Sequence, residues 1–251
     1  MQLSALLFRR KYIQIAQDKI SMSFLIKVII PAFNEEASIG KVLKEIPSFV
    51  SEIIVVSNNS SDKTTQVARE AGATVLHESQ KGYGYACLKG MQYIADQHPK
   101  PEIIVFLDGD YSDFPSEMDK IVAPIMEDDM DLVIGARVKH QREKGSMTVP
   151  QIFGNRLATS LMKLFFNANF TDLGPFRAMK YEKLLALNME DKTYGWTVEM
   201  QLKVIRKKYK YIEVPVHYKN RIGTSKVSGT VKGAIFAGVK ILSWIFKYSF
   251  K

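Results

Sequence analysis

Two carboxylates follow a short apolar run near the middle of the chain. The run spans residues 103–107, is rich in β-branched side chains and ends in Asp108-Gly109-Asp110. Such a run predicts a buried strand of a parallel sheet, and ligands of these sheets bind beyond the carboxyl ends of the strands. Gly109 lets the backbone turn so that both carboxylates approach one cation. Their oxygens suit Mg²⁺ or Mn²⁺ holding a diphosphate; the alternative is a solvated turn, and the position after a buried strand favours the metal.

The chain around this stretch alternates strand and helix patterns. Apolar runs predict strands at residues 25–30, 53–56, 74–76, 103–107 and 132–134, with amphipathic helices between them. This βαβα order predicts an α/β fold with a mostly parallel sheet and right-handed crossovers.

Polar loops follow these strands, so we expect their ligand-type side chains to gather at one edge of the sheet. For each residue taken singly, a helix cap or a turn is the alternative. The set comprises Asn34 and Glu35, residues 57–62, Lys81 and Gly82, Asp108 and Asp110, and Arg137.

The charge of the chain is unevenly distributed. Residues 1–136 contain 13 Lys and Arg against 19 Asp and Glu, whereas residues 137–251 contain 22 against 7. A basic half of this strength indicates a polyanionic partner such as phosphates, an anionic membrane surface or nucleic acid, with a solvated basic face as the alternative. No recognition helix, ribonucleoprotein motif or stacked aromatic platform is evident, and a nucleic-acid binder would leave the carboxylate pair unused. We therefore expect no nucleic-acid partner.

The ends of the chain differ in character. Residues 1–21 are expected to be a tail or short helix without a signal peptide, because their apolar residues precede Arg9-Arg10-Lys11. Residues 229–251 predict an amphipathic helix with Lys240 inside an apolar run too short to span a bilayer. We expect it to lie in the interface of an anionic membrane, with Trp244 and Tyr248 at headgroup depth; docking on the core of the domain is the alternative. The single cysteine, Cys87, fits a reducing compartment.

Several of these segments, taken in order, resemble a known family. Pro31-Ala32-Phe33-Asn34-Glu35, the loop at 57–62, Lys81-Gly82-Tyr83-Gly84 and Asp108-Gly109-Asp110 are similar to the nucleotide-binding half of family 2 glycosyltransferases, which have the GT-A fold. The second half resembles the branch that includes dolichyl-phosphate mannose synthase and related polyprenyl-phosphate glycosyltransferases. That likeness rests on Gly135-Ala136-Arg137, residues 171–178, Glu213-Val214-Pro215 and residues 221–226. The resemblance implies one GT-A domain over residues 22–228, with its nucleotide-binding half ending near 136 and its acceptor half following.

The resemblance also implies roles for individual residues. Asp108, Asp110 and Ser112 would lie at the Mg²⁺ or Mn²⁺ ion. Phosphates of the donor or acceptor would contact Arg137, Arg177, Arg221 and Lys226. The nucleotide would be bordered by Pro31, Asn34, Glu35, Ser57, Asn59, Lys81, Gly82 and Asp108. Ser57 stands where the family usually has Asp, which leaves both uridine and guanosine diphosphate sugars open as donors.

Catalysis would use Asp110, Arg137 and Asp172. Asp172 is the candidate general base, with the capping of a turn or the orientation of Arg177 as its alternative. A phosphate acceptor is already ionised near neutral pH, because its second pKa is about 6, so a strong base is less necessary.

The function implied is inverting, metal-dependent transfer of a hexose to a polyprenyl phosphate by a protein peripheral to the cytoplasmic face of a membrane. Two alternatives remain: transfer to a sugar hydroxyl of a cell-surface glycan, and a non-catalytic, membrane-associated nucleotide-binding protein.

Overall fold

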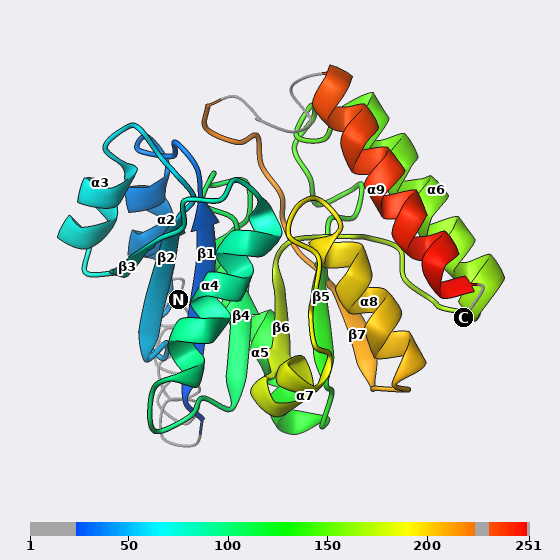
Figure 1. Cartoon of the computed structure of the whole chain (residues 1–251), viewed down its shortest axis with the longest axis horizontal. Coiled ribbons are helices and arrows are strands. Elements are labelled where there is room, and N and C mark those ends of the chain that lie inside the picture. Colours follow the sequence, from blue (N-terminus) through cyan, green and yellow to red (C-terminus); the bar gives the residue numbers. More distant parts are fainter. Residues whose placement is uncertain (1–23, 224–230, 250–251) are drawn as a thin grey trace, which may run out of the picture.

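The computed structural model describes residues 24–223 and 231–249 and shows one sheet with helices on both faces (Figure 1). Seven strands lie in the order β3-β2-β1-β4-β6-β5-β7. Their bounds are β1 Ile26–Ala32, β2 Glu52–Ser57, β3 Thr74–His77, β4 Ile103–Phe106, β5 Leu132–Ala136, β6 Arg177–Lys180 and β7 Tyr211–Pro215. All neighbouring pairs are parallel except those that β6 makes. The mostly parallel α/β sheet predicted from the sequence is confirmed.

Helices cover the two faces of the sheet in separate groups. Apolar residues of α2, α3 and α5 pack on one face, and those of α4, α6, α7, α8 and α9 pack on the other. Their bounds are α2 Ile39–Glu45, α3 Thr64–Glu70, α4 Tyr83–Ala95, η1 Pro115–Glu117, α5 Met118–Glu127, α6 Val149–Phe166, α7 Tyr181–Ala186, α8 Trp196–Arg206 and α9 Val231–Ser249. The alternating burial of strand side chains on both faces explains why these strands are almost wholly apolar.

Two strands were not predicted from the sequence: β7 at the edge of the sheet and β6 inside it. Strand β6 is the more unusual of the two. It inserts antiparallel between β4 and β5, pairing Val105 with Ala178 and Val133 with Ala178. It has only four residues, Arg177 to Lys180, with a cation at each end. So short and charged a segment carries no strand pattern of its own, and its two neighbours in the sheet determine its conformation.

Helices α6 and α9 lie side by side at one end of the molecule (Figure 1). The Phe165 and Phe246 rings meet edge to face with their centroids 5.9 Å apart. The inner side of α9 docks on the domain, where Trp244 and Ile245 are buried. The expectation that Trp244 lies at headgroup depth is therefore wrong, because its indole is enclosed by the core.

In the described residues, no helix is long and apolar enough to cross a membrane. Residues 1–21 and Lys226 lie outside the described residues.

Candidate functional site

The loops after the parallel strands contact one another at a single edge of the sheet. The Asn34 side chain, after β1, accepts a hydrogen bond from the Ser61 amide at 2.8 Å. The Asn34 amide donates to the Ser60 hydroxyl at 3.1 Å. Asn34 has a left-handed backbone, with φ 54°, which turns the chain away from the strand. The β1 and β2 loops thus hold each other, and Pro31 lies just before them in β1.

Asn58 connects the end of β2 to the Lys81-Gly82 turn. Its side-chain oxygen accepts from the Gly82 amide at 2.8 Å, and its side-chain nitrogen donates to the Gln80 carbonyl at 2.6 Å. The neighbouring Ser57 hydroxyl is buried without a partner among the described residues, and Asn59 is exposed. Asn58 lay in the 57–62 loop expected at this edge but was given no role of its own, because nothing in that run of polar residues separated it from Asn59.

A chain of charges joins the loop after β1 to the carboxylate pair. Arg221 forms ion pairs with Glu35 at 2.8 Å and with Asp110 at 3.0 Å. Asp110 also accepts from the Ser112 hydroxyl at 2.6 Å and from the Ser112 amide at 2.9 Å. Residues 186 positions apart in the sequence therefore meet at this edge. In this arrangement the Ser112 hydroxyl orients Asp110, and Arg221 balances two carboxylates.

Asp108 and Asp113 place further carboxyl oxygens beside Asp110. Burial raises the pKa of Asp108 to about 7, with the charge of Asp110 adding to the shift. One Asp108 oxygen and both Asp113 oxygens are enclosed without a hydrogen-bond partner among the described residues. Burial also raises the pKa of Asp113 well above its ordinary value. Asp113 was not predicted, because from its residue type and position alone it resembles an ordinary turn residue.

These oxygens fit a divalent cation shared with a ligand. Unpaired carboxyl oxygens that raise one another's pKa are stabilised when a cation arrives. Within residues 24–223 and 231–249, no three acidic, histidine or cysteine side chains form a complete metal-binding group. Asp108 and Asp110 would therefore supply two ligands, and a bound diphosphate would complete the coordination.

Arg137 and Asp172 form a buried, bidentate ion pair. The guanidinium donates to both carboxylate oxygens at 2.6 and 2.8 Å, and the Arg137 amide donates to Asp172 at 2.8 Å. Burial opposes the charge on Asp172, but Arg137 outweighs it and lowers the pKa of this carboxylate. The alternative in which Asp172 orients Arg177 is wrong, since its partner is Arg137.

Arg177 has a different environment from the one predicted for a phosphate ligand. Its side chain is fully buried, and it donates to the carbonyls of Leu173, Gly174 and Thr197. Its guanidinium is therefore not exposed to a surface from which a phosphate could approach. Arg177 instead holds the loop that carries Asp172.

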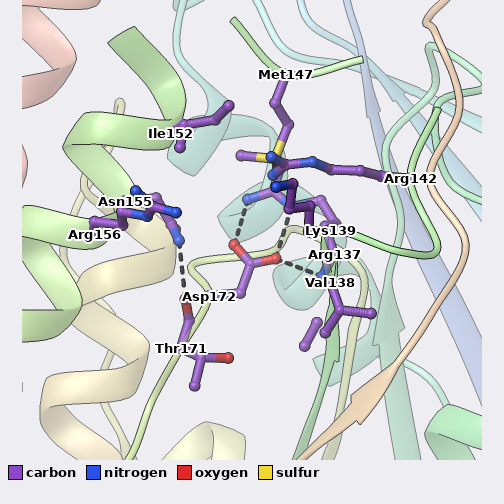
Figure 2. A pocket seen from close by; sticks show the side chains of 11 residues that line it. Arg137, Val138, Lys139, Arg142, Met147, Ile152, Asn155, Arg156, Thr171 and Asp172 are labelled. Carbon is purple, nitrogen blue, oxygen red and sulfur yellow. Dashed lines mark hydrogen bonds and ion pairs between the residues drawn. The ribbon is translucent and has the colours of Figure 1, made fainter. Parts of the chain in front are cut away.

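A cavity of about 220 Å³ opens beside the Arg137–Asp172 pair. Figure 2 shows it between the loop after β5 and the first turns of α6, with Met147 and Ile152 on its apolar side. Four cations line it: Arg137, Lys139, Arg142 and Arg156. The last three were not predicted as site residues. Their only signal was the excess of basic residues after position 136, which did not separate them from an ordinary basic surface.

Asp108, Asp110, Arg137 and Asp172 all lie within the part of the chain that matches one protein family. The model of "Glycosyl transferase family 2" matches residues 27–186. The chain belongs to glycosyltransferase family 2. This family 2 enzyme is 30% identical to a dolichyl-phosphate hexose transferase of Haloferax volcanii, over 82% of this chain and 88% of that protein. It is 29% identical to an undecaprenyl-phosphate mannosyltransferase of Micrococcus luteus, over 86% of this chain and 92% of that protein.

The fold of this glycosyltransferase also matches a solved structure. Glucosyl-3-phosphoglycerate synthase from Mycobacterium tuberculosis, in complex with Mn²⁺, uridine diphosphate and glucosyl-3-phosphoglycerate, superposes with a TM-score of 0.74. The match covers 92% of this chain and 82% of that chain at 19% identity. The GT-A fold expected from the sequence is confirmed by this similarity of structure.

Proposed function

We propose that this glycosyltransferase transfers a hexose from a nucleoside diphosphate sugar to a polyprenyl phosphate, with inversion at the anomeric carbon. The observation that carries the proposal is the cation-lined cavity between the carboxylate edge and α6. Arg137, in its wall, lies over the ring of Tyr218, and Tyr218 forms a β-bridge with Asp113 beside the carboxylate pair. The cavity thus adjoins the place where a donor diphosphate would bind.

On the donor side, Asp108 and Asp110 would hold Mg²⁺ or Mn²⁺. The metal would neutralise charge on the departing diphosphate. The solved synthase of the same fold, with its Mn²⁺ and uridine diphosphate, supports this assignment. Pro31, Asn34, Glu35, Ser57, Asn59, Lys81 and Gly82 would border the nucleotide. The uncharged Ser57 leaves uridine and guanosine both open as the base.

On the acceptor side, the cavity offers cations next to apolar side chains. A phosphate monoester matches Arg142, Arg156 and Lys139, and an attached hydrocarbon matches Met147 and Ile152. A sugar hydroxyl would need none of these charges. Two of the relatives are named as a dolichyl-phosphate hexose transferase and an undecaprenyl-phosphate mannosyltransferase, and both names support the same class of acceptor.

The proposed reaction is one displacement. An ionised acceptor phosphate oxygen attacks the anomeric carbon, the new carbon–oxygen bond forms, and the bond to the diphosphate breaks with its electron pair leaving on the nucleoside diphosphate. Because both Asp172 oxygens are engaged by Arg137, Asp172 would orient this cation toward phosphate rather than accept a proton. Arg221, which is ion-paired with Asp110, would help to fix the carboxylates on the donor side of the site.

A lipid acceptor requires access to a membrane, and the outer face of α6 and α9 suits one. Of the twelve large hydrophobic side chains that are exposed in the described residues, nine lie on these two helices. They are Val149, Phe153, Leu157, Leu164, Phe165, Ile235, Phe236, Val239 and Phe246. Neither helix contains an Asp or Glu, and both carry Lys or Arg. An apolar face on helices that carry no acidic residue fits the cytoplasmic, anionic side of a bilayer.

The test is transfer of radiolabelled hexose from UDP-glucose and GDP-mannose to undecaprenyl and dolichyl phosphate in detergent, with Mn²⁺ or Mg²⁺. Label in the organic phase is expected with one donor, and chelation should abolish it. Asp110→Asn should remove the activity, whereas Asp119→Asn, which changes an exposed carboxylate on α5, should retain it.

Parallel reactions distinguish the other acceptors. Transfer to an oligosaccharide or to 3-phosphoglycerate, with none to either lipid, would overturn the proposed acceptor. Nucleotide binding without transfer to any of them would favour the non-catalytic alternative.

A further inference from the structure

The segment 190–195 lies between the C-terminal helix and the beginning of α4. It follows α7 and leads into α8, and its backbone amides at Glu190 and Asp191 both donate to the buried Glu199 carboxylate at 2.8 Å. Glu199 in turn forms an ion pair with Lys203 at 2.7 Å. The 190–195 segment is therefore fixed to α8 and has a defined conformation rather than that of a free loop.

Asp191 ties this segment to α9. One carboxylate oxygen accepts from the Trp244 indole at 2.6 Å and pairs with Lys240 at 3.2 Å. The other accepts from the amides of Thr193 and Gly195 at 2.7 and 3.0 Å. The Asp191 side chain is fully enclosed, so four donors converge on two buried oxygens. Burial opposes this charge, but the donors, with Trp244 foremost, hold the pKa of Asp191 below its ordinary value.

The same segment supports the glycine-bearing turn on its other side. The Lys192 carbonyl accepts from the Tyr85 amide at 3.1 Å. A Cβ atom at Gly82 would collide with the Lys192 carbonyl oxygen, and one at Gly84 would collide with the Asp191 carbonyl oxygen. Both positions therefore require glycine, because two backbones meet without space for a side chain. Gly82 is also the residue whose amide Asn58 binds from the end of β2.

These contacts form one continuous path from α9 to the donor side of the site. Starting from Trp244 and Lys240, it runs through Asp191 and Lys192 to the turn at residues 81–84. Apart from the indole and ammonium contacts, it consists of backbone groups and one carboxylate, which leaves little freedom for one end to move without the other. We propose that Asp191 is a positioning residue that sets the 81–84 turn for the donor nucleotide according to how α9 is seated. The inference rests on the proposed function, in which this turn borders the nucleotide.

The experiment compares full-length variants by isothermal titration with UDP and GDP in the presence of Mn²⁺. Trp244→Phe keeps the aromatic packing but loses the indole donor, and Asp191→Asn leaves one acceptor oxygen for four donors. Both should raise the dissociation constant of whichever diphosphate the wild type binds by about fivefold or more. Ile245→Val is the matched control, because it trims a buried α9 side chain that makes no polar contact with Asp191. It should retain the wild-type dissociation constant.

Amide hydrogen exchange without nucleotide provides a second readout. The Gly82 and Tyr85 amides should exchange faster in Trp244→Phe and Asp191→Asn, at a temperature where melting curves show all variants folded. Unchanged exchange at both amides in both variants would overturn the path. If the wild type binds nucleotide and the two variants exchange faster but keep its dissociation constant, the positioning role would be overturned. A wild type that binds neither diphosphate would instead contradict the proposed donor site, and the exchange result would still decide whether the path exists.

Discussion

Arg137 engages both carboxylate oxygens of Asp172: three hydrogen bonds of 2.6–2.8 Å, two from the guanidinium and one from the backbone amide, join them inside the domain. Arg137 also lies over the Tyr218 ring, with its guanidinium carbon 5.1 Å from the ring centroid. A cation held on both sides in this way is preorganised, because little side-chain freedom remains to be lost when an anion binds.

Replacing Asp172 with Asn should impair acceptor binding more than donor binding. The amide retains one acceptor oxygen, so Arg137 loses its bidentate partner and its orientation. We expect the acceptor KM to rise about tenfold, equivalent to ~1.4 kcal/mol, with a smaller change in the donor KM. Steady-state kinetics with each substrate varied in turn would measure both. A lower kcat with both KM values unchanged would indicate instead that Asp172 takes a proton.

The pH profile offers an independent view of the same carboxylate. Because the pKa of Asp172 is lowered, this group is ionised throughout the neutral range. Saturating metal should keep Asp108 ionised, so the acidic limb should then follow the acceptor phosphate, whose second pKa is about 6. The rate should be constant above neutrality, fall as pH drops through that value, and keep the same midpoint in Asp172→Asn. A midpoint that moves with the substitution would contradict this assignment.

Asn58→Ala should weaken donor binding by releasing the 81–84 turn. The substitution leaves the Gly82 amide and the Gln80 carbonyl without their partner, at a cost of about 1–3 kcal/mol. We expect a higher donor KM with little change in that of the acceptor. Ser79→Ala is the control, since that side chain is exposed in the segment before Gln80 and has no role in the proposed site. Equal effects of the two would argue against this role for Asn58.

Membrane association should depend on the outer face of α6 and α9. Phe153 and Phe236 are 67% and 54% exposed, one on each helix. The double variant Phe153→Ser/Phe236→Ser should sediment less with anionic phospholipid vesicles, because burying apolar area stabilises binding by roughly 25 cal/mol per Å². Ile212→Ser on β7, at a residue 40% exposed, should sediment like the wild type. If the double variant were monomeric and the wild type dimeric, with equal sedimentation, the face would be a protein interface instead.

Much of the fold follows from local sequence patterns. The β1, β2, β3, β4 and β5 strands were all predicted to within a few residues, because uniform apolar runs and polar loops are local signals. Strand β6 was missed since its pairing is decided by residues tens of positions away. The docking of α9 on the domain could not be predicted in the same way. The hydrophobic pattern indicates an amphipathic helix but does not reveal that Trp244 donates a hydrogen bond to Asp191.

The candidate site divides in the same way. Residues within motifs, such as Asp108, Asp110 and Asn34, could be selected from sequence because their types and positions after strands are informative. Partnerships between distant residues could not: Arg221 with Glu35 and Asp110 depends on the folded chain. The roles predicted for these residues stay predictions, and the kinetic comparisons above address them.

Arg177→Met tests whether the buried guanidinium is structural. The variant keeps an apolar side chain of similar length but leaves the carbonyls of Leu173, Gly174 and Thr197 without a donor. Each lost hydrogen bond to a charged group costs about 1.5–3 kcal/mol, and 1 kcal/mol shifts the melting temperature of a domain of this size by about 2–4 °C. We therefore expect melting about 10 °C lower or more. At temperatures where the variant is folded, we expect a higher acceptor KM through displacement of the loop that carries Asp172. Lys180→Met, at the other end of β6, removes a cation paired with Asp129 and Asp131 near the surface and should change both quantities little. An Arg177→Met variant with unchanged melting and a raised acceptor KM would restore Arg177 as a direct phosphate ligand.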